Sequence, residues 1–266
     1  MRGREILLKS EREQDQKKII GMFNAIAKTY DTTNRILSFR QDEKWRKDAI
    51  ARALRWVYAF KGDLQNLAVG DVACGTADML LHIVQDLEHK GSLARMYGID
   101  PSEEMLRLAQ DKIAKQAPKQ APIQLECLEA KNLSPLQNEE LDLITIAYGL
   151  RNVLDRHAAL REFSRTLKKG GVLLVLEFMR CDQRGILGTL AHFYTSKILP
   201  IIGMLLSRNY SAYAYLPASI EDFISVDELE DELNAVGLEV VEKKHYLYKS
   251  VSCILAVKNT QEQACT

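Results

Sequence analysis

Acidic side chains recur where short apolar runs of the sequence end. Asp71 lies near the end of the first run, Asp100 directly follows the second, and Glu129 stands just beyond the third. The three runs are Leu67–Val72, Tyr97–Ile99 and Ile123–Cys127. Because helical patterns separate them, the runs indicate parallel strands, whose carboxyl ends share one edge of a sheet. Carboxylates at that edge favour a ligand that carries positive charge or a ribose diol.

The turn after the first strand narrows the choice of ligand. A dinucleotide-binding turn requires glycines at 73, 75 and 78, but only Gly75 is present, and Asp78 would repel a pyrophosphate. The Gly-Lys-Ser/Thr ending of a P-loop is also missing. An acidic turn of small residues, with Asp71 and Gly75 as binding candidates, suits a cationic ligand with an amino-acid end. S-adenosylmethionine, with its sulfonium and ammonium groups, fits this description.

Asp100 ends the second strand, where a carboxylate can accept hydrogen bonds from a ribose diol. The same residue opens a helical segment that contains Ser102, and either side chain could cap that helix. The two roles are compatible, since a capping carboxylate keeps one oxygen free.

Length and composition limit the class of protein. The chain has 266 residues, 47% of them hydrophobic, which suits one large α/β domain with an appendage. Its formal net charge is zero, so no global field attracts nucleic acid, and we expect no nucleic-acid partner. The five cysteines are scattered without zinc-ligand spacing, which predicts reduced thiols, a cytoplasmic location and no bound metal.

Two amphipathic helices are predicted before the first strand, at Arg12–Lys28 and Gln41–Tyr58, with a polar break at Thr29–Asn34 between them. Neither belongs to the alternation of strands and helices that follows. We therefore expect residues 1–62 to form a helical cover over the site.

Further strands alternate with helices along the rest of the chain. The strands are expected at Leu141–Tyr148, Val172–Phe178, Glu239–Leu247 and Val251–Val257. The helices are expected at Met79–Leu87, Met105–Ile113, Asp155–Lys168 and from the capping box at Ser225 to about Gly237. This order predicts a Rossmann-like α/β domain at 63–258, with a cap insertion at about 185–222 and a flexible tail at 259–266.

Four spaced motifs resemble one family. They are Tyr30-Asp31-x-x-Asn34-x-x-Leu37-Ser38, Gly149-Leu150-Arg151-Asn152-Val153, Arg165-x-Leu167-Lys168-x-Gly170-Gly171 and Tyr213-x-Tyr215-Leu216-Pro217-x-Ser219-Ile220. In this order they are similar to those of the UbiE/MenG family of ubiquinone and menaquinone biosynthesis C-methyltransferases. The resemblance extends from about Phe23 to Val257. It implies the class I S-adenosylmethionine-dependent methyltransferase fold, with a mostly parallel seven-stranded sheet.

The resemblance also implies positions for the cofactor contacts. They fall on Thr76 in the turn, Asp100 at the ribose, Glu129 and Ala130 near the adenine, and Ala147 at the end of the fourth strand. Two of these depart from the family pattern, since Glu129 stands where Asp or Asn is expected and Ala147 where serine is usual.

Further departures lie outside these contacts. Ala77 replaces a glycine, where an added Cβ could narrow the approach of the methionine end, and Asp42 stands where the N-terminal signature has His.

The implied reaction is methylation of a ring carbon on a prenylated quinol. Such a carbon becomes nucleophilic when a ring hydroxyl loses its proton, so the site needs a base or a cation that stabilises the phenolate. Arg151 and Asn152, just after the fourth strand, are the leading candidates. Arg151 could instead be a structural residue that pairs with Glu177 or Asp155.

Three more residues are catalytic candidates. His157 is an alternative base by its pKa, although a histidine on the first turn of a helix is more often solvated. Tyr30 and Asp31, on the predicted cover, could reach the acceptor, and Tyr30 could instead be an aromatic plug over the cofactor.

The apolar segment 185–207 contains His192, Lys197 and Pro200, and it predicts a buried or interfacial helix pair rather than a membrane span. A prenyl tail requires an apolar groove that opens toward a membrane, so a transient peripheral contact with the inner face of the membrane is expected. The oligomeric state stays open, with a homodimer as one option.

The sequence thus predicts an enzyme that converts demethylmenaquinol to menaquinol with S-adenosylmethionine as cofactor. Three alternatives remain open. They are the analogous benzoquinol methylation of ubiquinone synthesis, an O- or N-methyltransferase of another apolar small molecule, and a non-catalytic cofactor-binding protein.

Overall fold

The computed structural model describes residues 2–180 and 210–259. Within them, seven strands form one sheet in the order β3-β2-β1-β4-β5-β7-β6. They are β1 (Leu67–Val72), β2 (Leu93–Ile99), β3 (Ile123–Glu126), β4 (Leu141–Ala147), β5 (Leu167–Phe178), β6 (Leu238–Tyr246) and β7 (Val251–Lys258). The first five strands pair in parallel, while β7 is antiparallel to both β5 and β6. The predicted fold class is confirmed.

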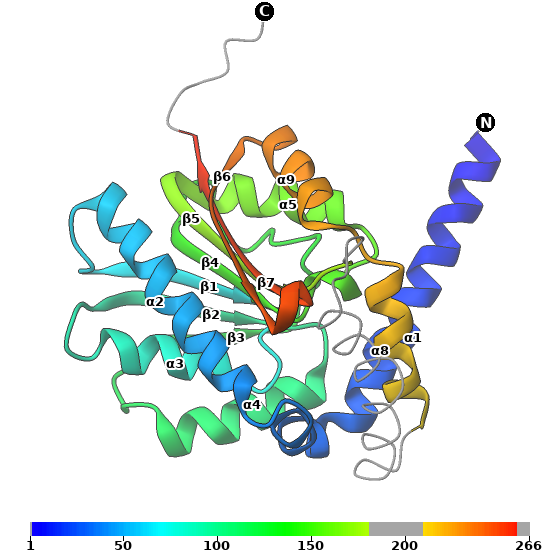
Figure 1. The fold of residues 1–266 in the computed structure, drawn as a ribbon, viewed down its shortest axis with the longest axis horizontal. Coiled ribbons are helices and arrows are strands. Elements are labelled where there is room, and N and C mark those ends of the chain that lie inside the picture. The colour runs from blue at the N-terminus through cyan, green and yellow to red at the C-terminus, as the bar shows by residue number, and fades with distance from the viewer. Residues whose placement is uncertain (1, 181–209, 260–266) are drawn as a thin grey trace, which may run out of the picture.

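Helices cover both faces of this sheet (Figure 1). They are α2 (Gln41–Lys61), α3 (Asp78–Leu87) and α4 (Glu103–Gln116) on one face, and α5 (Arg156–Thr166) and α9 (Val226–Ala235) on the other. Each face has its own core of buried apolar side chains, to which the strands contribute alternately. The central strands β1 and β4 are buried along almost their whole length, because helices cover both of their faces.

The N-terminal helix α1 (Arg2–Leu37) is a single helix of 36 residues. The prediction of a break at Thr29–Asn34 is wrong. The hydroxyl of Thr29 donates a hydrogen bond to the carbonyl of Ile26, and Thr33 is buried. Asp31 accepts hydrogen bonds from Thr76 and Lys112, which lie outside this helix. These contacts offset the low helix propensity of Thr, Asp and Asn.

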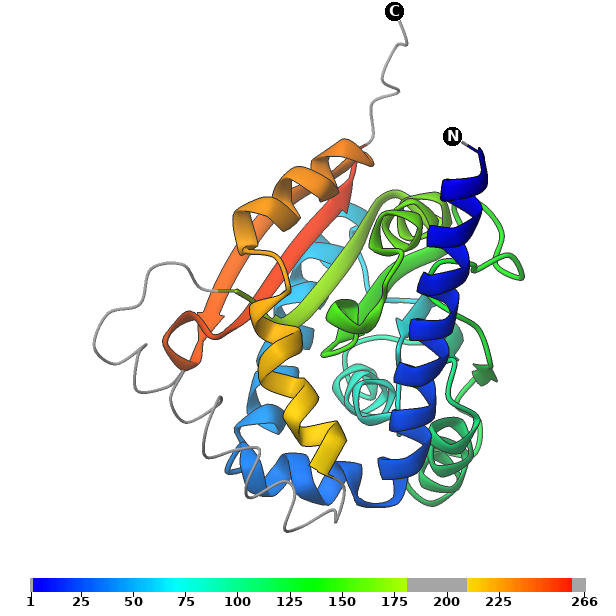
Figure 2. The ribbon, with the colours of Figure 1, turned by 90° about the vertical axis from the view of Figure 1, so that its right-hand side faces the viewer.

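The second helix, α2, follows a tight turn in which Phe39 and Arg40 have positive φ. Its apolar stripe belongs to the core on one face of the sheet, through Ala49, Ile50, Ala53, Leu54 and Val57. The expectation that both N-terminal helices lie outside the core is therefore wrong for α2. Of these two helices, it is α1 that lies across the carboxyl ends of the strands. There α8 (Tyr210–Glu221) lies beside it (Figure 2).

The boundary between α5 and β5 also differs from its prediction. The helix ends at Thr166 rather than Lys168, and β5 starts directly afterwards at Leu167, which pairs with Leu141. The strand register shifts beyond this pair, and Gly170 there has a φ of +76°. The glycine pair expected to close the helix thus lies inside an irregular strand.

Two short 3-10 helices, η1 (Leu150–Asn152) and η3 (Leu247–Lys249), complete the described elements. The predicted capping box at Ser225 is confirmed, with Glu228 as its reciprocal partner. The predicted insertion at about 185–222 lies largely outside the described residues, as does nearly all of the predicted tail.

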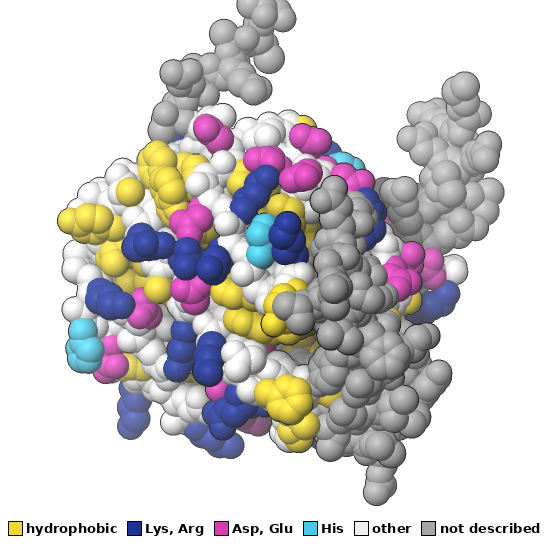
Figure 3. All heavy atoms as spheres, viewed as in Figure 1, with side chains coloured by type: hydrophobic (Ala, Val, Ile, Leu, Met, Phe, Trp, Pro, Cys, Tyr) yellow, Lys and Arg dark blue, Asp and Glu magenta, His cyan; other side chains and the backbone are white. Residues whose placement is uncertain are grey.

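The face seen in Figure 3 carries interspersed charges rather than one sign. Arg52 and Arg55 on α2, for example, both pair with Glu242 on β6. No helix among the described residues is long and apolar enough to cross a membrane.

Candidate active site

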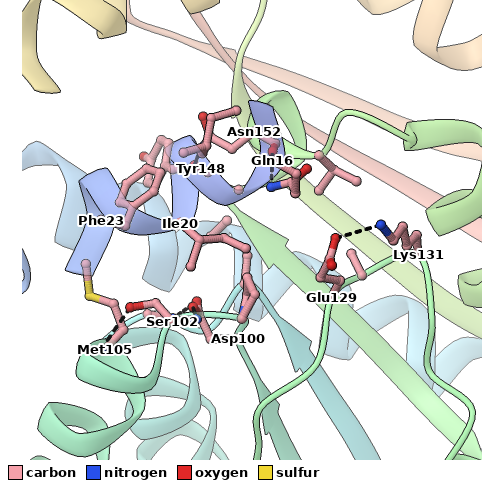
Figure 4. A pocket seen from close by; sticks show the side chains of 18 of the residues that line it. Gln16, Ile20, Phe23, Asp100, Ser102, Met105, Glu129, Lys131, Tyr148 and Asn152 are labelled. Atoms are coloured by element: carbon pink, nitrogen blue, oxygen red, sulfur yellow. Dashed lines mark hydrogen bonds and ion pairs between the residues drawn. The ribbon is translucent and has the colours of Figure 1, made fainter. Parts of the chain in front are cut away.

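A pocket of about 730 Å³, part of it open to solvent, lies between α1 and the carboxyl ends of the strands. Gln16, Ile20 and Phe23 reach into it from α1, and Asp100 and Glu129 face them from the ends of β2 and β3 (Figure 4). The pocket therefore combines an apolar roof with acidic residues at its base.

Asp100 is 7% exposed and fixed by two backbone amides. Its Oδ2 accepts from the N–H of Gly75 at 2.9 Å, and its Oδ1 accepts from the N–H of Ser102 at 2.8 Å. Ser102, and not Asp100, caps α4, since its Oγ accepts from the N–H of Met105. Burial raises the pKa of Asp100 to about 6. Because each carboxylate oxygen can accept a second bond, Asp100 can also bind a ligand hydroxyl.

Of the predicted binding residues in the turn after β1, Gly75 lines the first pocket and Thr76 does not. Gly75 lines the pocket with a φ of +52°, and an added Cβ there would meet nothing within 4 Å. Thr76 does not line the pocket, because its hydroxyl donates to Asp31 at 2.6 Å. Ala77 has a φ of +73° and is fully buried in the hydrophobic core. Its side chain does not line the first pocket.

Asp71 lies behind the pocket wall rather than in it. It is 1% exposed, and its Oδ1 accepts from the hydroxyl of Thr145 at 2.5 Å. Its Oδ2 is buried and has no hydrogen-bond partner among the described residues. Burial raises the pKa of Asp71 to about 7.

The remaining predicted cofactor contacts all line the first pocket. Ala130 and Ala147 contribute to its wall, and Glu129 stands at its edge. Glu129 pairs with Lys131 at 3.0 Å (Figure 4). The structure thus brings together Gly75, Asp100, Glu129, Ala130 and Ala147, while Thr76 and Asp71 lie outside the lining.

A network of charges joins α1 to the turn after β1. Lys112 of α4 donates to Asp31 at 2.6 Å and to Asp78 at 2.5 Å. Arg35 of α1 reaches Asp78 at 3.1 Å and Glu43 at 2.8 Å. Asp31, a predicted catalytic residue, lines neither pocket described here, and its contacts are those of a residue that fastens α1 to the domain.

A second pocket, of about 880 Å³, adjoins the first beneath the end of α1. Most of its lining is apolar or aromatic, including Trp45, Phe178 and Leu216, and its cations are Arg46 and Arg151. Three residues line both pockets: Phe23, Tyr30 and Tyr148. The two cavities therefore meet at a wall of aromatic side chains.

Arg151 lines the second pocket and is held by a buried acid. Its Nη1 donates to Glu177, which is fully buried, and to the carbonyl of Tyr148 at 2.9 Å. The alternative pairing with Glu177 raised by the sequence is therefore present. Its Nε is buried and has no partner among the described residues. Asn152 lines the first pocket and accepts from the hydroxyl of Tyr215 at 3.2 Å.

The structure does not bring His157 to either pocket. Its side chain is 65% exposed on the first turn of α5, with Nε2 3.7 Å from Glu232. Tyr30 does reach the site, where burial raises the pKa of its hydroxyl. Tyr30 packs edge-on against Phe23, with ring centroids 6.1 Å apart.

Sequence reasoning missed three residues of this region: Lys112, Arg46 and Tyr148. Lys112 and Arg46 are single cations on amphipathic helices, and a charged residue there usually points to solvent. The sequence places Tyr148 only at the end of a strand. Its position one residue before the Gly149-Leu150-Arg151-Asn152 motif was the available signal.

The sheet order and the pocket at its carboxyl edge define the class I S-adenosylmethionine-dependent methyltransferase fold. A methyltransferase from Aquifex aeolicus described as SAM-dependent has this fold with a TM-score of 0.52, at 19% identity, over 74% of this chain and 86% of that one. Magnesium protoporphyrin IX methyltransferase from Synechocystis, solved with bound SAH, matches with a TM-score of 0.61 and 16% identity, over 92% of this chain and 100% of that one.

Sequence comparison then gives the family. The model of the ubiE/COQ5 methyltransferase family matches residues 11–258. Ubiquinone/menaquinone biosynthesis C-methyltransferase UbiE of Campylobacter jejuni is 43% identical over 92% of this chain and 99% of the relative. Demethylmenaquinone methyltransferase of Geobacillus stearothermophilus is 32% identical over 93% of this chain and 99% of the relative. The chain belongs to the ubiE/COQ5 methyltransferase family and is an S-adenosylmethionine-dependent C-methyltransferase.

The first pocket has the chemistry that this cofactor requires. Asp100 offers carboxylate oxygens for a ribose diol, and Gly75 leaves open space beside the turn. Ile20, Phe23 and Met105 add apolar walls to the pocket. The residues present therefore fit the cofactor.

Proposed function

We propose that this enzyme methylates a ring carbon of a prenylated quinol, converting demethylmenaquinol to menaquinol. The observation that carries the proposal is the pair of pockets joined at Phe23, Tyr30 and Tyr148. The first holds acidic residues suited to the cofactor, and the second is aromatic and contains two arginines, which suits a ring with oxygen substituents. The names of the two relatives support a quinone substrate.

We assign the cofactor to Gly75, Asp100, Glu129, Ala130 and Ala147 in the first pocket. When bound there, S-adenosylmethionine supplies an electrophilic methyl group on a sulfonium. The protein holds the two partners at the shared wall and keeps water out by packing α1 over the strand ends. The net reaction forms a ring C–CH₃ bond, breaks the sulfonium C–S bond and releases one proton.

Arg151 is the proposed stabiliser of the acceptor phenolate. It lines the second pocket, and Glu177 and the carbonyl of Tyr148 fix its Nη1. Its positive charge, in a pocket lined mostly by apolar and aromatic side chains, lowers the free energy of a nearby oxyanion. Asn152 borders the first pocket and, through Tyr215, links η1 to α8.

Tyr30 contributes a wall to both pockets rather than a base, because burial raises its pKa and keeps its hydroxyl protonated. Asp31 is assigned to the network that fastens α1, and His157 has no proposed role in the reaction.

Because the acceptor carries a prenyl tail, we expect the enzyme to bind transiently to a membrane surface from the cytoplasm. The second pocket is lined by apolar side chains such as Met22, Leu37 and Leu216, and exposed Ile36 and Tyr248 are chain neighbours of its lining residues Leu37 and Leu247. An apolar pocket with exposed apolar side chains next to its lining residues in the chain suits a transient peripheral contact, through which a long tail can stay in lipid.

The proposal is tested with methyl-labelled S-adenosylmethionine and a short-tailed demethylmenaquinone, with and without dithionite. Label on the ring carbon only after reduction is the expected result, because the quinol is nucleophilic and the quinone is not. A short-tailed benzoquinol precursor serves as the parallel acceptor. Preference for it would replace the naphthoquinol assignment, and label on oxygen would contradict carbon methylation. Cofactor binding without turnover on either acceptor would contradict the assignment of a quinol as the substrate.

A further inference from the structure

Tyr148 has an unusual position at the wall between the two pockets. It follows β4 directly, and its φ of +59° places it in the left-handed region, where an aromatic residue is rarely found. Its N–H donates to the carbonyl of Leu176 at 2.7 Å, and its own carbonyl accepts from Arg151 and Asn152. Three contacts thus hold a strained backbone, which occurs mostly at functional sites.

The ring of Tyr148 is well packed, but its hydroxyl makes no hydrogen bond to the described residues. Its ring lies 5.5 Å from that of Phe178, and the guanidinium of Arg46 lies over it at 5.1 Å from the centroid. The residue is 8% exposed, and its hydroxyl has no hydrogen-bond partner among the described residues. A buried hydroxyl without a partner costs free energy, so a ligand that supplies one would gain affinity.

Arg46 is itself buried and fixed in place. It pairs with Asp42 at 2.5 Å, and Asp42 also accepts from the hydroxyl of Ser38 at 2.5 Å. All three residues line the second pocket. The pocket thus has a cation on the α2 side, beside Tyr148, in addition to Arg151 on the η1 side.

We propose that the Tyr148 hydroxyl donates a hydrogen bond to the ring oxygen that becomes the phenolate, and that Arg46 adds to the stabilisation that Arg151 gives to the negative charge on that oxygen. This inference rests on the proposed function, because it requires an oxygen-bearing ring in the second pocket. Burial raises the pKa of Tyr148 and keeps the hydroxyl protonated, as a donor must be. Tyr148 and Arg46 then contact one oxygen of the acceptor and orient the ring toward the first pocket.

The test is Tyr148→Phe, which keeps the ring and removes only the hydroxyl. We expect turnover of the reduced acceptor to fall about 10- to 100-fold, with cofactor affinity within twofold of wild type. The melting temperature should not fall, because the lost hydroxyl has no partner in the free protein. Tyr97→Phe is the matched control, since Tyr97 donates to Glu140 at 2.8 Å away from both pockets. It should lower stability and leave turnover unchanged.

Two mono-methyl ethers of the short-tailed naphthoquinol identify the oxygen that is contacted. The ether at the contacted oxygen cannot ionise there and should not be methylated by the wild type, whereas with the other ether the effect of Tyr148→Phe should persist. Wild-type turnover in Tyr148→Phe, while the wild type is active, would overturn this inference alone. A wild type that methylates no quinol would overturn the proposed function and this inference with it.

Discussion

The ionisation state of Asp100 should determine how tightly the first pocket binds its ligand. Its carboxylate is buried, and its pKa of about 6 means that it carries a proton below that pH in the free protein. Only the ionised form attracts a cation and accepts two hydroxyl hydrogens. The affinity for S-adenosylmethionine should therefore increase as the pH rises from 5 to 7.

Asp100→Asn keeps the size of the side chain and removes its charge. We expect it to weaken cofactor binding by about 1–3 kcal/mol at pH 7 and to flatten the pH dependence. Isothermal titration calorimetry at several pH values measures both effects. A wild-type affinity that does not change between pH 5 and 7, or an unchanged affinity in the variant, would contradict the ribose assignment.

At single residues, the sequence predicts those pocket-lining residues whose place depends on the end of a strand. Asp100 and Glu129 could be placed because each follows a strand of the parallel sheet. The sequence does not show that Thr76 and Asp31 bond to each other across 45 residues of chain. The spacing of residues in a sequence does not tell which polar side chain will form a hydrogen bond to a residue of a distant element.

The helix α1 is fastened to the domain at three places along its length. Gln16 exchanges hydrogen bonds with the backbone of Asn152 and Leu154. Asn24 accepts from Ser102 at the start of α4, at 2.6 Å, and Asp31 bonds to Thr76 and Lys112. Because α1 also roofs the first pocket, its attachment should control how tightly the cofactor is held.

Lys112→Met tests this attachment. The ammonium group bridges Asp31 and Asp78 and is largely shielded, with 16% of the side chain exposed. Its loss leaves two carboxylates with less compensation, so we expect unfolding free energy to fall by about 1–3 kcal/mol. Hydrogen exchange in α1 should become faster, and the cofactor should dissociate faster.

Lys90→Met is the control for this element. Lys90 pairs with Asp86 at 2.7 Å on an exposed surface, so its removal should cost less than about 0.5 kcal/mol and leave α1 unchanged. Equal effects of the two substitutions, or normal exchange in α1 of Lys112→Met, would contradict the role given to the network.

Across the whole molecule, each face of the sheet packs against its own layer of helices. Helices α2 to α4 on one face and α5 and α9 on the other form two cores that hold the strand ends in register. The site lies where those ends meet α1 and α8 (Figure 2). The alternation of strands and helices made this layered fold predictable, since hydrophobic periodicity depends on local sequence.

The arrangement over the site was less predictable. The periodicity of α1 does not tell which face of the domain it covers, and the apolar stripe of α2 looks the same whether it packs on a sheet or on another helix. The second pocket is built from α1, α2, η1, β5, α8 and η3, whose lining residues extend from Met22 to Leu247 in the sequence. Long-range packing of this kind has no signature in one sequence.

The most direct test of the two-pocket account is a crystal structure with S-adenosylhomocysteine and a short-tailed quinol bound together. The account predicts the ribose hydroxyls about 3 Å from the Asp100 carboxylate and the quinol ring in the second pocket, against Tyr148 and Arg151. A nucleoside bound away from Asp100, or a ring outside the second pocket, would contradict it.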